Sequence, residues 1–419
     1  MIEFLRTVPD PRKERNRRHD HAEILLCLAI GYAAGKTSYR RAMEWCERHI
    51  SFLRTGMTLK NGVPSVSTVS RLMSSIDEEL FLYAFMEWIG EILDSRGLHL
   101  IIDGKALRGA TSKVRGERTP MIMNVIDAQT KLVLCQYPID CKENECAAIP
   151  KLLKLLNIRG STVTIDAIGT NTGIMEQIVQ AGGHYVLTVK RNNPETYEDL
   201  VRTFQELGKT YEDSQADGSC KKRYQELLAK YEQDDHYEKN RERHEHRYYQ
   251  VCHDPTVLER TMRDWGSVKT VGCVRQIRIP VRRNEKGEET TPDEKTFLQN
   301  REKTIGADAD DGRSAKVQMV GVVSDRELSL DEMAKIKRQH WMIENSLHHV
   351  LDDTFREDRS PAKRSRNNLA LIRKISYNVL RIAFKEEISP GVMTERMDIF
   401  ADSPDLITKY FFSPILSLN

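Results

Sequence analysis

Apolar side chains recur at helical spacing through the first hundred residues. The three-and-four periodicity predicts helices at 22–34, 38–51 and 80–93. Between the last two, a turn at 62–64 leads into a serine- and threonine-rich segment, which predicts a short capped helix carrying Arg71. Such a helical unit either packs as a domain or places a helix in a DNA groove, and the pattern favours neither.

From residue 98 the pattern changes to short apolar runs that are typical of strands. We predict, in order, strands at 98–102, 121–126 and 132–137, a helix at 147–156, a strand at 161–165, a helix at 173–181 and a strand at 185–189. This is the element order of the ribonuclease H-like fold. The expected fold class is therefore α/β, with a ribonuclease H-like core built on a mixed five-stranded sheet.

Beyond residue 190 the chain becomes more charged. We interpret 200–250 as helical and 282–294 as a charged turn region, and we predict strands at 268–279 and 317–323 and helices at 337–352 and 367–384. The core needs only one more helix here, so we place a mixed α+β insertion at about 195–318. The predicted domains are an N-terminal helical domain at 1–95, an α/β domain at 96–385 that carries the insertion, and a C-terminal tail at 386–419.

The predicted helix at 337–352 carries an unusual polar row. Ile343, Leu347 and Leu351 form an apolar stripe that must be buried. Beside it, at four-residue steps, follow the side chains of His340, Glu344, His348 and Asp352. A polar row that borders a buried face needs a partner, and we interpret that partner as a divalent metal shared with two upstream aspartates.

These two aspartates are Asp103, at the end of the first predicted strand, and Asp166, at the end of the fourth. One aspartate at a strand end is more often a turn or cap residue. In the predicted fold, however, the two strands are neighbours, and Glu344 joins them from a helix. Three carboxylates make an all-oxygen site that suits Mg²⁺ or Mn²⁺ rather than zinc. Two such ions, about 3.5–4 Å apart, support in-line phosphoryl transfer.

Other interpretations of the same residues stay open. His340, Glu344 and His348 could hold zinc in a hydrolase, which would leave both aspartates unexplained. His348 could instead orient a phosphate or a metal-bound water, although a histidine there is more often a supporting or surface residue. Just beyond strand ends, on the side of the acids, lie groups suited to DNA phosphates: Lys105, Arg108, Lys190 and Asn192.

The composition limits the domain number, the possible partners and the location that can be expected. The 419 residues leave room for two or three domains, and 64 Lys and Arg against 62 Asp and Glu give a net charge of +2, so any basic surface must be local. The apolar run at 24–34 is too short to span a bilayer, and the charged start argues against a signal peptide, so we expect no membrane partner. Eight cysteines without CxxC pairs argue against structural zinc and favour a cytoplasmic location.

At these residues the chain resembles the H-repeat-associated insertion-sequence transposases, a branch of the DDE transposases. The likeness covers nearly the whole chain. It rests on the blocks 10–12, 62–65, 102–109, 142–145, 164–167 and 243–247, and above all on His340-Trp341-Met342-Ile343-Glu344-Asn345-Ser346-Leu347-His348. The chain departs from the Tyr-Arg-Glu-Lys signature of related transposases, because His340 and Leu351 stand at its arginine and lysine positions.

The resemblance implies a catalytic triad of Asp103, Asp166 and Glu344 and dependence on divalent metal. It implies cutting and joining of double-stranded DNA, with transposon ends and target as partners and a homodimer in the synaptic complex. Arg338 becomes a candidate for holding the phosphate at the transposon end. The alternatives are a two-metal nuclease that cuts without joining, and a DNA-binding derivative that has lost catalysis.

Overall fold

A computed structural model of the chain describes residues 1–110, 119–139, 144–217, 225, 228–239, 243–258, 265–296, 316–360, 362–384 and 393–413. The chain has a mixed α/β fold and divides into two compact units. Unit 1 comprises Met1–Thr164, Ala181–Gly183 and Gln339–Asn419. Unit 2 comprises Ile165–Gln180 and His184–Arg338.

The helices of unit 1 begin where the sequence provides a capping side chain. Asp20, Ser38 and Ser65 each accept a hydrogen bond from a backbone N–H in the first turn of the helix that follows. The three long helices predicted in the first hundred residues and the short capped helix are confirmed. The N-terminal helices are α1 (Ile2–Thr7), α2 (His21–Ala33), α3 (Tyr39–Arg48), α4 (Ile50–Leu53), α5 (Val66–Met73) and α6 (Glu78–Ile92).

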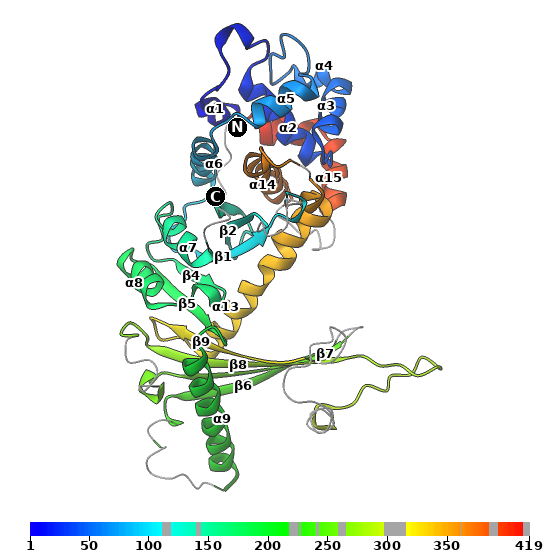
Figure 1. Cartoon of the computed structure of the whole chain (residues 1–419). Helices are drawn as coiled ribbons and strands as arrows, with labels where there is room; N and C mark the ends of the chain where they lie inside the picture. Colours follow the sequence, from blue (N-terminus) through cyan, green and yellow to red (C-terminus); the bar gives the residue numbers. More distant parts are fainter. Residues whose placement is uncertain are drawn as a thin grey trace. The chain divides into compact units, whose positions relative to one another are not determined.

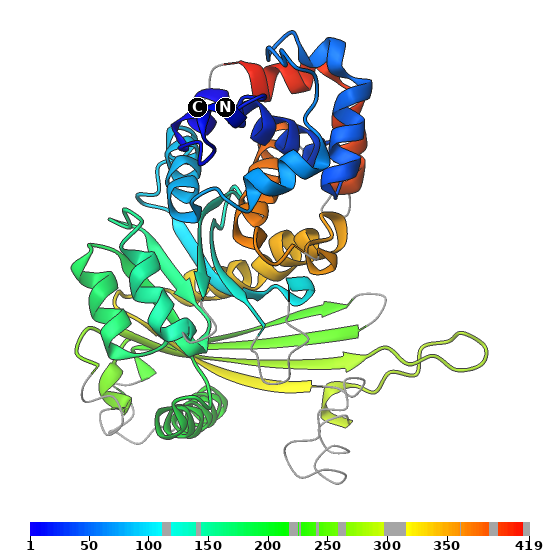
Figure 2. The same cartoon turned by 45° about the horizontal axis from the view of Figure 1, so that its top comes forward.

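Helix α2 is the centre of this helical layer. All but its first residue are buried, and it packs against α3 and against the C-terminal helix α14 (Arg366–Ala383), as Figure 2 shows. The predicted helix at 367–384 is therefore confirmed as α14. Further along, the described part of the C-terminal segment forms α15 (Met393–Ala401) and α16 (Pro404–Ile407). No described helix is long and apolar enough to cross a membrane.

The strands of unit 1 follow the order β3-β2-β1-β4. They are β1 (His99–Ala106), β2 (Met121–Asp127), β3 (Val133–Ile139) and β4 (Thr162–Ile165), and α7 (Glu145–Leu153) packs on β2 and β3. Strands β1, β2 and β3 pair antiparallel, which places Asp103 opposite Asn124 and Asn124 opposite Gln136. These three positions form one polar row across a face of the sheet.

One predicted boundary was wrong. The sequence placed Asp103 at the end of the first strand, but β1 continues to Ala106 because residues 104–106 keep pairing with Met121–Met123 of β2. No apolar run marks this extension, since it contains a glycine and a lysine. A Cβ at Gly104 would lie 2.5 Å from Oε1 of Glu145, so a side chain there would require that carboxylate to move. Asp103 and Lys105 consequently share one face of β1.

The strands of unit 2 follow the order β5-β9-β8-β7-β6, and every pair is antiparallel. They are β5 (His184–Val189), β6 (Tyr231–Lys239), β7 (Arg243–Cys252), β8 (Thr270–Pro280) and β9 (Lys316–Ser324). Helix α8 (Thr172–Gln180) packs on β5, and the long helix α9 (Pro194–Asp217) packs on β8 and β9, as Figure 1 shows. Helix α13 (Leu330–Ile343) follows β9.

The prediction of helix throughout 200–250 was wrong. Helix α9 ends at Asp217, and 231–239 and 243–252 are strands. The alternation of buried and exposed positions in β7 was hidden because its buried positions include the charged Glu245 as well as Tyr249 and Val251. The strands predicted at 268–279 and 317–323 are confirmed as β8 and β9. Lys142 and Glu143 of the block at 142–145 lie outside the described residues.

Gly109→Ala is predicted to destabilise unit 1. A Cβ at this position would lie 2.3 Å from the carbonyl oxygen of Asp358 and 2.9 Å from that of Ser360, and backbone atoms cannot move aside as a flexible side chain can. Overpacking of this kind costs about 1–3 kcal/mol. Thermal or urea unfolding measures the loss.

The matched control is Gly90→Ala in α6, where a Cβ would meet nothing within 4 Å. Alanine is the better helix former, so this variant should be neutral or up to about 1 kcal/mol more stable. Equal stability of the two variants would show that the contact at Gly109 is not a tight one.

Candidate metal centre

Asp103, Glu344 and His348 converge in unit 1. Their ligand atoms all lie within 4.8 Å of one another, which makes them the one group among the described residues that could hold a metal ion. Nδ1 of His348 lies 3.7 Å from Oδ2 of Asp103 and 3.4 Å from Oε2 of Glu344. The imidazole is buried, whereas the Glu344 side chain is 69% exposed, so the group opens to solvent on the side of the glutamate.

The helical segment that carries Glu344 widens at this residue. Helix α13 ends at Ile343, and π-helical turns follow at Glu344–His348 and Val350–Thr354. The continuous α-helix predicted over 337–352 is thus correct in its first half, and its second half is a wider helix. Short π-helical turns occur frequently at functional sites. Glu344 and His348 remain neighbours across this turn.

Asn124 supports His348 from the sheet. It is fully buried, its Nδ2 lies 3.4 Å from Nε2 of His348, and its Oδ1 has no hydrogen-bond partner in the described part of the chain. With the amide turned over, Oδ1 would accept a hydrogen bond from Nε2–H, and the lone pair of Nδ1 would face both carboxylates. Two carboxylate oxygens and an oriented imidazole nitrogen are a donor set that fits a divalent cation.

The predicted polar row divides among three partners. Nδ1 of His340 is 3.1 Å from the hydroxyl of Thr164, which also bonds Nε2 of His99 at 3.1 Å. Glu344 and His348 face Asp103, and Asp352 pairs with Lys105. The structure therefore does not gather the zinc set of the alternative interpretation, because His340 is directed at Thr164.

Lys105 belongs to a buried charge network. It is 5% exposed, and its Nζ lies 2.5 Å from Asp352 and 3.2 Å from Glu357. Glu357 is buried and also lies 3.6 Å from Arg373. Contact between Lys105 and a DNA phosphate would require these pairs to break. Arg108, in contrast, is 81% exposed at its side chain, and its backbone N–H donates to Asp358.

This network tunes the pKa of Glu357. Burial alone would raise it, but the positive charges of Lys374, Arg373 and Lys105 outweigh burial and hold the pKa of Glu357 below its usual range. Burial has the opposite effect on Lys374, whose pKa falls to about 8, with Glu357 acting against the fall. Nζ of Lys374 also donates to Gln136, at the end of the polar row that starts at Asp103.

Asp166 and its neighbours lie in unit 2. Asp166 directly follows β4, as predicted, and its Oδ1 lies 2.7 Å from Nζ of Lys190. The Asn192 amide donates to the carbonyl of Ala167 at 2.6 Å, so Lys190 and Asn192 both hold the segment that starts at Asp166.

Sequence reasoning missed Lys337 in this region. It is buried, donates to the hydroxyl of Thr188 at 2.5 Å, and has its pKa lowered to about 8 by burial, while Asp166 acts to raise it. Its position four residues after the buried Met333 was the available signal, because it places Lys337 on the inner stripe of α13.

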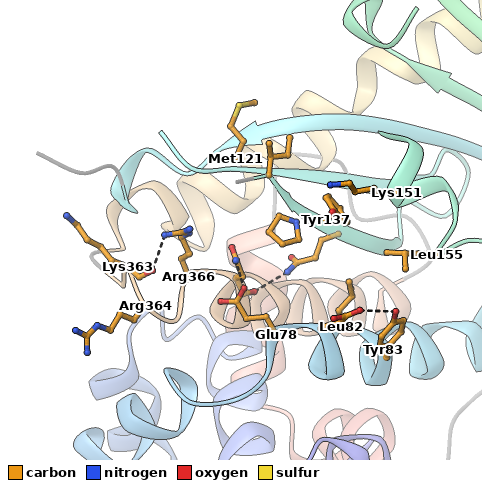
Figure 3. A pocket seen from close by; sticks show the side chains of 15 residues that line it. Glu78, Leu82, Tyr83, Met121, Tyr137, Lys151, Leu155, Lys363, Arg364 and Arg366 are labelled. Atoms are coloured by element: carbon orange, nitrogen blue, oxygen red, sulfur yellow. Dashed lines mark hydrogen bonds between the residues drawn. The ribbon is translucent and has the colours of Figure 1, made fainter. Parts of the chain in front are cut away.

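A separate cavity of about 720 Å³ lies in unit 1 (Figure 3). It is lined by residues of α6, β3, α7 and the start of α14, with Lys363, Arg364 and Arg366 on one side. None of the residues that line it is a predicted site residue, so the cavity and the acidic group are different features.

The class of protein is shown by two transposase family models that together match most of the chain. The family model "Transposase DDE domain" matches residues 94–379, and "DDE_Tnp_1-associated" matches residues 2–89. The chain therefore belongs to the DDE transposase family, and the family resemblance drawn from the sequence is confirmed.

Curated relatives cover from about half to nine tenths of the chain. "Putative protein YbfL" and "H repeat-associated putative transposase YhhI" of Escherichia coli (strain K12) are each 27% identical over 91% of this chain and 90% of their own length. "Uncharacterized protein in dhlA 3'region" of Xanthobacter autotrophicus is 35% identical over 48% of this chain and 69% of its own. A chain of a solved piggyBac transposase synaptic complex with hairpin DNA aligns over 99% of this chain and 80% of its own. The identity is 12% and the TM-score is 0.44.

Glu357→Gln is predicted to lower stability at neutral pH by about 3–5 kcal/mol, because it leaves buried cations without their counter-charge. The folded-state pKa of Glu357 is below its unfolded value of about 4.5, so its stabilisation is complete above that pH and is lost as the pH falls through the folded-state value. Urea unfolding of both proteins from pH 7 to pH 3 should show their difference shrinking toward acid.

Glu91→Gln, at an exposed position of α6, is the control and should stay within about 0.5 kcal/mol of the parent chain. If the stability difference between Glu357→Gln and the parent does not change with pH, Glu357 is not held in its ionised form by the network.

Proposed function

We propose that this chain is a DNA transposase that cuts and joins the ends of an insertion sequence by phosphoryl transfer. The single observation that carries the proposal is the convergence of Asp103 and Glu344 on one buried imidazole in a chain of the DDE transposase family. The proposed catalytic residues are Asp103, Asp166 and Glu344. The proposed core is ribonuclease H-like, with β1 to β5 as its five strands.

Asp166 lies two residues after Thr164, whose hydroxyl is bonded to two histidines of unit 1. Thr164, the last residue of its segment in unit 1, bonds His340 and His99, which lie four residues before Glu344 and Asp103 respectively. Asp166 follows two residues later, and two residues of extended chain span about 7 Å at most. The proposal includes Asp166 as the acid that directly follows β4.

The three carboxylates would hold Mg²⁺ or Mn²⁺, and we propose two ions. When bound, such ions supply Lewis acidity and favour ionisation of the attacking water. The protein's part is positioning. The Gly104 N–H donates to Oδ1 of Asp103 at 3.0 Å and fixes that carboxylate, and Lys190 compensates the charge of Asp166. His348 lies between two acids, which favours a role in holding them over a contact with phosphate.

Contacts with double-stranded DNA are proposed at Arg108, Lys190, Asn192 and Arg338, with Lys105 dependent on release from its carboxylates. Water attack would cut the element end, and the freed 3′ hydroxyl would attack target DNA. We further propose a cytoplasmic protein that acts as a homodimer on paired transposon ends.

Glu344→Gln is predicted to lower cleavage of a labelled transposon end by about 10³-fold or more. A metal ion contributes several kcal/mol to the transition state, and each 1.36 kcal/mol is a factor of ten. Binding of the same DNA should be retained. The matched control is Asp353→Asn on the same helical segment, whose exposed side chain pairs with His349 instead of the acidic group.

The products distinguish the proposed function from its rivals. Joined products in addition to cut ends support a transposase, and cut ends alone indicate a nuclease. Unchanged cleavage by Glu344→Gln would remove the assigned site, and a parent chain that binds DNA without cutting it would indicate a derivative that has lost catalysis.

Mn²⁺ should bind the DNA-free parent chain, and Asp103→Asn should weaken this binding at least tenfold, because it removes one anionic ligand. Titration calorimetry measures the affinity. Asp353→Asn is again the control and should bind Mn²⁺ as the parent chain does. Equal affinity of Asp103→Asn and the parent would place the ion elsewhere.

A further inference from the structure

One face of β7 carries a cluster of arginines. Alternate residues of a strand share a face, so Arg243, Glu245, Arg247 and Tyr249 lie together. Strand β8 adds Arg278, which pairs in register with Glu245. We call Arg243, Arg247 and Arg278 the arginine face.

A single buried carboxylate organises these arginines. Glu245 is almost fully buried and lies 3.3 Å from Arg243, 3.0 Å from Arg247 and 3.2 Å from Arg278. Its amide neighbour Gln276 also donates to it. One carboxylate cannot neutralise three guanidinium groups. The exposed Glu238 also contacts Arg247, at 3.0 Å, so the three guanidinium groups share two carboxylates.

The same face holds two buried polar atoms that call for a further ligand. Within the described part of the chain, Nε of Arg247 and the hydroxyl of Tyr249 have no hydrogen-bond partner, and Tyr249 is only 3% exposed. Burial raises the pKa of Tyr249, while Arg247 and Arg338 act to lower it, so Arg338 of α13 contributes a fourth positive charge at this place. Unsatisfied buried donors beside clustered guanidinium groups are the features of an anion site.

The opposite face of β7 has the opposite chemistry. There His244 lies 2.7 Å from Glu289, and His246 lies 2.9 Å from Glu294, so carboxylates cover its imidazoles. The side chains of Arg243 and Arg278 are 45% and 37% exposed, which leaves both within reach of a ligand from solvent.

We propose that the arginine face binds backbone phosphates of double-stranded DNA, with Glu245 as the residue that positions the guanidinium groups. Guanidinium groups match the oxygens of a phosphodiester in pairs, which a carboxylate-covered histidine face cannot do. The inference rests on the proposed function, because it takes DNA as the substrate. It adds a binding surface far along the chain from the catalytic acids.

The test is the salt dependence of DNA binding by the full-length chain. The double variant Arg243→Gln, Arg278→Gln removes the two exposed charges and leaves the buried pair of Glu245 and Arg247 in place. For the parent chain and the variant, the affinity for a short duplex is measured over a KCl series. Each lost phosphate contact lowers the slope of log K against log[salt] by about 0.9, so the variant should lose about 2 from the slope.

The matched control is Arg275→Gln. Arg275 is on β8 as well, but three residues from Arg278 and thus on the other face, where it lies over the ring of Tyr248. For Arg275→Gln, the slope of log K against log[salt] should change by less than half as much as for the double variant. Melting temperatures of all three proteins confirm that the fold is retained, and inorganic phosphate alone is titrated in a separate arm.

If the parent chain binds DNA and the slope is unchanged in the double variant, the arginine face does not bind DNA. The proposed function would remain intact. A parent chain that binds no duplex would overturn both. Stabilisation of the parent chain by inorganic phosphate, with DNA binding independent of Arg243 and Arg278, would make the face a small-anion site and overturn its role on DNA.

Discussion

The repulsion between carboxylates is the constraint on which the site depends. Asp103 and Glu344 come from a strand and from a helical segment far away in the chain, and both approach the same imidazole nitrogen. Like charges this close disfavour joint ionisation unless a positive charge lies between them. The fold maintains the approach through backbone pairing of β1 with β2 and through the buried anchors of the helical segment, so a cation bound there would relieve the repulsion.

Other residues of unit 1 hold the helical segment in place through buried charged side chains. Lys105, Glu357, Arg373 and Lys374 form a buried charge network on the sheet face that carries Asp103. Buried ion pairs are weak sources of net stability, but breaking one is expensive. Because Lys105 also pairs with Asp352, this network ties the helical segment to β1 beside the acidic group.

Much of this could be predicted from the sequence, because the informative signals are local. Apolar periodicity and capping residues located the helices, and the acids were found by their place after apolar runs and within a helical row. The extension of β1 beyond Asp103 could not be predicted, since the pairing of Gly104 and Lys105 with β2 is a long-range property. Strands β6 and β7 were missed because a buried glutamate among arginines imitates a solvated helix. The roles of Lys105 and Lys337 needed the packed structure, which alone shows that both ammonium groups are buried.

The central proposal is that Asp103, Asp166 and Glu344 share one ion-binding site. Fe²⁺ can replace Mg²⁺ at carboxylate ligands, and peroxide then generates hydroxyl radicals that cut the backbone close to the bound ion. The account predicts three cuts in the DNA-free chain, near residues 103, 166 and 344, all suppressed by excess Mg²⁺. Cuts near 103 and 344 with none near 166 would contradict it.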